Sequence, residues 1–231
     1  MEYLNFIVVF ISLSLTPVRP SVRAQSAAHA ETERLLDNAQ VGADIHVKEE
    51  VPLALADLLR GTGLTGGVAE EIGCSAPPEV QLDVRQGTTV RTAMDAFAAE
   101  NPGYRWIENA GVVNVTPANE FPLLRARIRS FELETTETAR AVLFNLLNIP
   151  EVRQRAAELN LKPGLIQGWA EALPTASSYP KAKTPIHLSL QDVSLQEAFN
   201  SVVRFYGRTI WIYDERQCNG ERTYLVRATE K

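Results

Sequence analysis

The sequence predicts an α+β fold of two small units, each ordered β-α-β and then β-α-β-β, with two helices packed against small mixed sheets. An internal repeat is the first observation behind this prediction, because residues 80–115 return in pattern as residues 184–215. The length of 231 residues is the second, since it suits two small domains that can each bury a core.

The helix of each copy carries apolar residues at i, i+3, i+4, i+7 and i+8, which is the stripe of a core-facing helix. The stripe comprises Val90, Ala93, Met94, Phe97 and Ala98 in the first copy and Leu195, Ala198, Phe199, Val202 and Val203 in the second. Every second-copy position is the first-copy number plus 105, and the same offset relates Trp106 to Trp211. We expect Phe97, Phe199 and both tryptophans to lie in the core.

A half-buried strand precedes each of these helices, because apolar and polar residues alternate there. The apolar positions are Val80, Leu82 and Val84 in the first copy and Ile186, Leu188 and Leu190 in the second. The strand offset is 106, and the loop at Gly87 absorbs the additional residue. Thr89 and Ser194 stand at the helix N-caps, and Ser194 with Glu197 makes a capping-box sequence.

A further β-α-β pattern lies upstream of the first copy. In chain order we expect a short helical turn (31–39), a strand (43–47), a helix opened by Pro52 and stopped by Gly61 and Gly63, and a crossing segment (64–72). After each repeated helix, a strand with the tryptophan, a turn and a last strand complete the unit.

The segments VPLALADLLRGTGL and VQLDVRQGTTVRTAMDAFAAENPGYRWIENAGVVNV resemble the secretin and TonB N-terminus short domain, the STN domain. The likeness lies in the Leu-rich helix, the strand and helix that follow, and the closing aromatic strand and hairpin. It covers residues 43–117, and the repeat implies a second STN-like copy over residues 121–231. The resemblance implies two helices sandwiched between small sheets, a periplasmic setting and a role in protein contacts.

The second half begins after residues 117–122, PANEFP, which have a proline at each end and are the expected linker. An amphipathic strand with a cationic outer face is predicted next. Its apolar positions are Leu124, Ala126 and Ile128, and its cationic positions are Arg125, Arg127 and Arg129. Two helices are expected over 139–147 and 151–159. Residues 161–184, which include Trp169, are predicted as a long proline-broken loop.

Residues 1–24 have the pattern of a signal peptide. Residues 6–15 form an apolar run of ten residues. This run is too short to span a bilayer, but it is long enough for the hydrophobic region of a signal peptide. We expect cleavage after Ala24, with a second small-residue site at Ala28-His29-Ala30, and residues 25–42 as an N-terminal segment. A buried N-terminal strand or helix is the alternative. The mature chain is expected to be soluble and periplasmic, without a transmembrane segment.

Cys74 and Cys218 are the two cysteines of the sequence, and each stands among loop residues. In an exported protein such a pair can form a disulfide. Two free thiols are the alternative, because the sequence does not show whether the two Cα atoms approach within roughly 7 Å.

The net charge of −5 is unevenly distributed. Residues 25–120 carry 15 acidic and 6 basic residues, whereas residues 121–231 carry 12 acidic and 15 basic residues. Neither half has the basic excess of a nucleic-acid-binding domain, so no nucleic-acid partner is expected. The asymmetry favours contact between the halves and makes the acidic half a candidate partner for the three arginines.

The potentially reactive residues lack catalytic spacing. His46 and His187 share no motif, and Ser177-Ser178 lack the glycines of a nucleophile elbow. The glycines at 61–67 follow a helix, whereas a phosphate loop precedes one, and the cysteines and histidines lack metal-ligand spacing. The acidic pairs Glu49-Glu50 and Glu70-Glu71 are expected to be solvated loop charges. We expect a protein that is not an enzyme and that holds no metal or cofactor.

Two functional hypotheses follow. The first is a periplasmic protein-interaction module, accessory to an outer-membrane secretion, uptake or signalling system, that binds an envelope protein through a sheet edge or through Arg125, Arg127 and Arg129. The second is a small-molecule-binding protein or enzyme with a pocket under the loop at 161–184.

Overall fold

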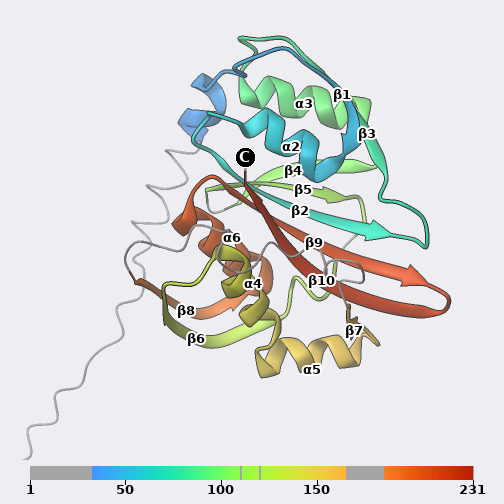
Figure 1. The fold of residues 1–231 in the computed structure, drawn as a ribbon, viewed down its shortest axis with the longest axis vertical. Helices are drawn as coiled ribbons and strands as arrows, with labels where there is room; N and C mark the ends of the chain where they lie inside the picture. Colours follow the sequence, from blue (N-terminus) through green and yellow to red (C-terminus); the bar gives the residue numbers. More distant parts are fainter. Residues whose placement is uncertain (1–32, 110, 120, 165–184, 231) are drawn as a thin grey trace, which may run out of the picture.

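The computed structural model describes residues 33–109, 111–119, 121–164 and 185–230 as a stack of layers around one central sheet (Figure 1). The central sheet has six strands, a pair of helices covers each of its faces, and a two-stranded sheet covers each helix pair from outside. The layers enclose two hydrophobic cores, one on each face of the central sheet.

The first unit contains two helices and five strands, preceded by a helix at residues 33–38. Its elements are β1 (Ile45–Glu50), α2 (Val51–Leu59), β2 (Thr65–Ile72), β3 (Glu79–Val84), α3 (Val90–Glu100), β4 (Tyr104–Asn109) and β5 (Val112–Pro117). Pro52 stands in the first turn of α2, where its missing N–H costs no hydrogen bond. The Thr89 side chain caps α3 by accepting a hydrogen bond from the Thr92 N–H.

The second unit has the same order with one added helix, α5. Its elements are β6 (Arg127–Thr135), α4 (Ala139–Leu147), α5 (Pro150–Glu158), β7 (Lys162–Pro163), β8 (Ile186–Ser194), α6 (Leu195–Tyr206), β9 (Thr209–Cys218) and β10 (Glu221–Glu230). The predicted capping box starts α6, because Ser194 and Glu197 bond each other's backbone N–H groups. Asn219 and Gly220 both have positive φ angles and form the tight turn between β9 and β10.

The central sheet runs in the order β4-β5-β2-β9-β10-β7, so its first three strands come from the first unit and its last three from the second. Within each set, the first two strands are antiparallel and the last two are parallel. The sets meet where β2 pairs in parallel with β9. Strand β9 therefore runs opposite to β4, its equivalent in the repeat. A half-turn about an axis that lies in the sheet, perpendicular to the strands, relates the directions of the two units. This rotation places the helices of the two units on opposite faces of the central sheet.

The alternation of side chains along the central strands supplies both cores. On β9, Ile210 and Ile212 enter the core of the first unit, whereas Trp211 and Tyr213 enter the core of the second. The inner strands are thus buried on both faces, and only pairing between the units makes this possible.

Most elements predicted from periodicity are confirmed. All five apolar positions of the second-copy stripe are buried, as are four of the first, with Ala98 half-buried. Strand β1 begins at Ile45, two residues later than predicted, and continues directly into α2. Strand β6 begins at Arg127, because residues 122–125 form a turn in which Ala126 N–H donates to the Leu123 carbonyl.

The predicted loop at 161–184 is wrong at its start. Lys162 and Pro163 form β7, paired in parallel with Thr223 and Tyr224 of β10. Proline fits this place because β7 pairs with a neighbour on one side among the described strands. Residues 165–184, Trp169 among them, and the signal peptide at 1–24 lie outside the described residues.

The expected domain boundary at 117–122 falls between β5 and β6, in the segment that passes from one unit to the other. Each core also takes side chains from the other unit, since Ile210 and Ile212 pack into the first core and Ala69 and Val112 into the second. That each half unfolds as a separate domain stays a prediction.

Core position predicts the cost of truncating two phenylalanines. Phe97 on α3 and Phe199 on α6 are 3% and 0% exposed, so Phe→Ala at either should lower the free energy of unfolding by about 3 to 5 kcal/mol. Phe205 on α6 is 54% exposed and provides the matched control, with an expected loss below about 1 kcal/mol. Urea denaturation measures all three. Equal losses at Phe199 and Phe205 would contradict the assignment of the helix faces.

Candidate functional site

The joint between the units is a tightly fitted parallel ladder. Gly67 of β2 lies directly opposite Trp211 of β9, and a Cβ atom on Gly67 would overlap the indole ring. Gly66 is similarly close, because a Cβ there would lie 3.0 Å from a methyl group of Leu55. The two glycines therefore let β2 approach β9 beneath a large aromatic side chain. The sequence placed these glycines in a segment after a helix and did not indicate their packing role.

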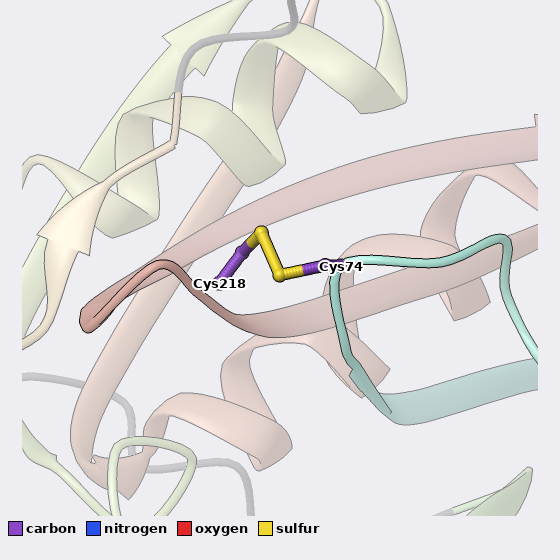
Figure 2. Close-up of a disulfide and its surroundings, with 2 residues drawn as sticks. All are labelled: Cys74 and Cys218. Carbon is purple, nitrogen blue, oxygen red and sulfur yellow. A yellow bond between two sulfur atoms is a disulfide. The ribbon is translucent and has the colours of Figure 1, made fainter.

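A disulfide ties the two units together at one end of this ladder. Cys74 follows β2, Cys218 ends β9, and their Cα atoms are 4.8 Å apart (Figure 2). The bond joins residues 144 positions apart, and closure of a loop of this length stabilises a fold by roughly 2 to 4 kcal/mol. The structure thus contains the disulfide, one of the two alternatives that the sequence left open.

A charged cluster is buried in the same ladder. Glu70 of β2 and Asp214 of β9 are neighbours across the strands, and both are fully buried. The Arg227 guanidinium on β10 donates to both carboxylate oxygens of Asp214, at 2.9 and 3.2 Å, whereas its nearest approach to Glu70 is 4.0 Å. Neither Glu70 oxygen accepts a hydrogen bond from a donor group among the described residues. The expected solvated loop charge at Glu70 is therefore wrong, because β9 and β10 cover this part of β2.

Burial raises the pKa of Glu70 to about 8, and the negative charges of Asp214 and Glu50 add to the effect, which Arg227 partly opposes. A carboxyl in an unfolded chain has its ordinary pKa near 4.5. Between these two values the folded protein holds a proton that the unfolded chain has lost. This proton makes the folded protein more stable at the acidic end of the range.

Stability should therefore fall as pH rises from about 5 to 8. The contribution of Glu70 is a loss of up to about 1.4 kcal/mol in the free energy of unfolding per pH unit. Glu70→Gln removes the ionisable group, so its stability relative to the parent should increase steadily over this range. Glu71→Gln, at the exposed neighbouring position, is the control. Urea denaturation at four pH values measures the difference, and a constant difference between Glu70→Gln and the parent would contradict the assignment.

One edge of the central sheet is β4, the strand that corresponds to β9 in the repeat, and the other edge is the two-residue strand β7. Strand β4 pairs with β5 on one side, and no described strand pairs with it on the other. Trp106 is half-buried there. Its equivalent Trp211 has β2 beside it and is fully buried in the core of the second unit. Ile107 is 48% exposed, whereas its equivalent Ile212 is 3% exposed. The outer side of β4 is therefore exposed in the first unit, whereas the outer side of the equivalent strand β9 is covered in the second unit.

The backbone of β4 has hydrogen-bonding groups on this open side. Asn109 pairs with Val112 across a two-residue hairpin connection, so these flanking residues exchange hydrogen bonds and the pattern alternates from there. The N–H and C=O groups of Trp106 and Glu108 consequently point away from β5. A strand from another molecule can pair with these groups.

The Trp106 side chain is held in place on α3. Its indole N–H donates to the Asp95 carboxylate at 3.0 Å, and the Arg91 guanidinium lies 5.9 Å from the ring centroid. Trp211 makes the corresponding bond to Asn200 of α6, at 2.7 Å. The repeat offset of 105 residues relates Asp95 to Asn200, so the two acceptors are equivalent. Both tryptophans are therefore anchored to their own helix by the same contact.

Of the three arginines predicted to bind a partner, Arg127 and Arg129 lie on β6, in the outer two-stranded sheet that β6 forms with β8. Arg125, Arg127 and Arg129 are all exposed, and Arg125 lies in the turn before β6. Arg127 forms an ion pair with Asp192 of β8 at 2.7 Å. This sheet and the β4 edge belong to different layers (Figure 1), so the structure does not bring the two candidate surfaces together.

The remaining candidate residues are dispersed. His46 pairs with Asp83 at 2.9 Å on the β1–β3 sheet, and His187 is exposed on β8. Within the described ranges no group of three or more His, Cys, Asp or Glu residues could hold a metal ion.

A cavity of about 570 Å³ lies beside the start of β1, bordered by residues 41–47, Asp57 and Arg60. The pocket expected under the loop at 161–184 falls largely outside the described residues.

No protein-family model, curated protein or solved structure matches the chain. In the part of the chain that the structure describes, no helix is both long and apolar enough to cross a membrane.

Proposed function

We propose that this chain is a non-enzymatic periplasmic protein-interaction module that binds an extended strand of an envelope protein at the edge of β4. The observation that carries the proposal is the difference between the two copies of the repeat. Ile212 of β9 lies beside β2 and is buried in the core of the first unit. Ile107 of β4 is 48% exposed, and no described strand lies on the outer side of β4. Strand addition supplies the missing backbone bonds and buries the exposed apolar side chain.

The STN-like character of each unit is part of this proposal. It is supported by the order of elements, since both units place two helices between a two-stranded sheet and three strands of the central sheet. The proposed periplasmic location is supported by the signal-peptide pattern and by the Cys74–Cys218 disulfide, since disulfides persist in oxidising compartments. The proposed partner is a component of an outer-membrane secretion, uptake or signalling system.

Site-specific cross-linking tests the β4 edge. A photo-reactive amino acid at Arg105, an exposed position on β4, should give one discrete adduct in the cell envelope. Ile107→Lys should reduce this adduct at least ten-fold, because a charged side chain in the middle of an edge strand opposes pairing. Leu53→Lys on α2 is the matched control, since Leu53 has the same exposure of 48%. Mass spectrometry then identifies the adduct.

An adduct that is equally strong in both lysine variants would place partner binding elsewhere than at β4. An adduct with a cytoplasmic protein would contradict the proposed location.

The arginine surface on β6 gives a separate prediction. Changing Arg125, Arg127 and Arg129 together to Ser should leave the melting temperature nearly unchanged, because an exposed pair such as Arg127–Asp192 contributes only about 0 to 1 kcal/mol. Binding of an acidic partner should weaken, more at low salt than at high salt. Binding of the cross-linked partner at two salt concentrations measures this, with the triple Arg→Lys variant as a charge-preserving control. Unchanged binding at low salt would identify these arginines as solvated surface.

A further inference from the structure

We infer that the strand bound at β4 runs parallel to it, carries a glycine opposite Trp106 and belongs to a protein other than this chain. The inference rests on the proposed function and specifies the chemistry of its partner. It derives from the joint between the two units, where the chain fills the corresponding edge with its own strand β2.

The direction of the bound strand follows from the repeat. Strand β9 is hydrogen-bonded to β10 on one side in an antiparallel ladder and to β2 on the other in a parallel one. Strand β4 has the corresponding antiparallel ladder with β5, and its other side is open. Because Trp106 and Trp211 are equivalent, the outward backbone groups of β4 have the spacing that β9 presents to β2. A parallel strand fits this edge as β2 fits β9.

The glycine follows from how the tryptophans are anchored. In the filled joint, Trp211 is held by Asn200, and its indole occupies the space that a side chain on Gly67 would need. In the open copy, Asp95 holds the Trp106 indole N–H through the equivalent bond from α3. By equivalence, this anchor is expected to direct the Trp106 ring over the open side of β4, as the Trp211 ring lies over Gly67. An incoming residue directly opposite Trp106 therefore fits only if it has no Cβ atom, which means that it is a glycine.

The next position on the bound strand should be apolar. Val68 follows Gly67 on β2 and lies opposite Ile212, and both are buried in the core of the first unit. Ile107 is the equivalent of Ile212 and is exposed. A partner with an apolar residue after its glycine would cover Ile107 in the same way. The expected motif on the partner is therefore glycine followed by an apolar residue in an extended strand.

A second copy of this chain does not offer such a strand from its described residues. The described strands at the edge of a sheet are β1, β3, β4, β6, β7 and β8. Neither these strands nor β10, of which only Thr223 and Tyr224 pair with β7, contain a glycine. The glycine-bearing strand β2 is enclosed between β5 and β9. Strand β7, which corresponds to β2 in the second unit, consists of Lys162 and Pro163. Among the described residues, a second copy thus offers no open strand that contains a glycine, and the bound strand is assigned to a different protein.

Two synthetic peptides test the inference on the full mature chain with its disulfide formed. The first has the β2 sequence TGGVAEEI, blocked at both ends, and the second is the same peptide with Gly67→Val. Amide NMR spectra of the labelled protein should show that the first peptide perturbs residues 104–109 and the Trp106 indole N–H. The second should bind at least ten-fold more weakly. Ile107→Lys should abolish the perturbation, and Leu53→Lys should preserve it.

Direction is read from a nitroxide label on the peptide N-terminus. A parallel strand places this label near Tyr104, as Thr65 lies near the start of β9, so Tyr104 should be broadened more than Asn109. The reverse pattern would overturn the parallel assignment.

Equal binding of the two peptides would overturn the glycine requirement while leaving strand addition at β4 intact. Binding of neither peptide would overturn the inference, and the cross-link at Arg105 would then decide the proposed function independently. Concentration-dependent self-association that perturbs β4 and is lost in Ile107→Lys would identify a second copy as the occupant and would likewise overturn it.

Discussion

The parallel pairing of β2 with β9 is the contact on which the rest of the architecture depends. Without it, each unit would be a thin layer of two helices and small sheets with one face of its three strands exposed to water. The pairing gives the inner strands of the central sheet a second covered face, because the helices of the two units lie on opposite sides. Gly66 and Gly67 make the approach of the strands close enough, and the Cys74–Cys218 bond holds it at one end.

Elements with a clear period could be predicted from the sequence. The helical stripes that include Phe97 and Phe199 are in the cores, and the Ser194 capping box is formed, because helix formation depends on residues three or four positions apart. Burial of β2 could not be predicted in the same way. Its residues TGGVAEEI have neither a period of two nor a continuous apolar run, and they are buried because a strand 144 positions later covers them. Pairing between distant strands has no local signature.

The candidate site was predicted only in part. Trp106 and its repeat partner Trp211 were identified by their spacing, but the difference in their surroundings arises from which strand lies next to each. Glu70 looked like a surface charge because a neighbouring glutamate accompanies it, yet alternation along β2 sends Glu70 inward and Glu71 outward. The three arginines were correctly expected to be exposed, since exposure on an amphipathic segment follows from the apolar residues between them. What an exposed residue binds is a property of a second molecule.

The long separation between β2 and β9 has a consequence for the order of folding. Contacts within each unit are closer in sequence than the joint, so the entropy of loop closure delays the joint until both units have formed. Until then, β2 of one chain is an exposed glycine-bearing strand, and β4 and β9 of any other chain are edges of matching shape. Newly made chains at high concentration can therefore exchange β2 between molecules before the disulfide closes. Early oxidation of Cys74 and Cys218 within one chain commits β2 to its own β9 and leaves β4 open.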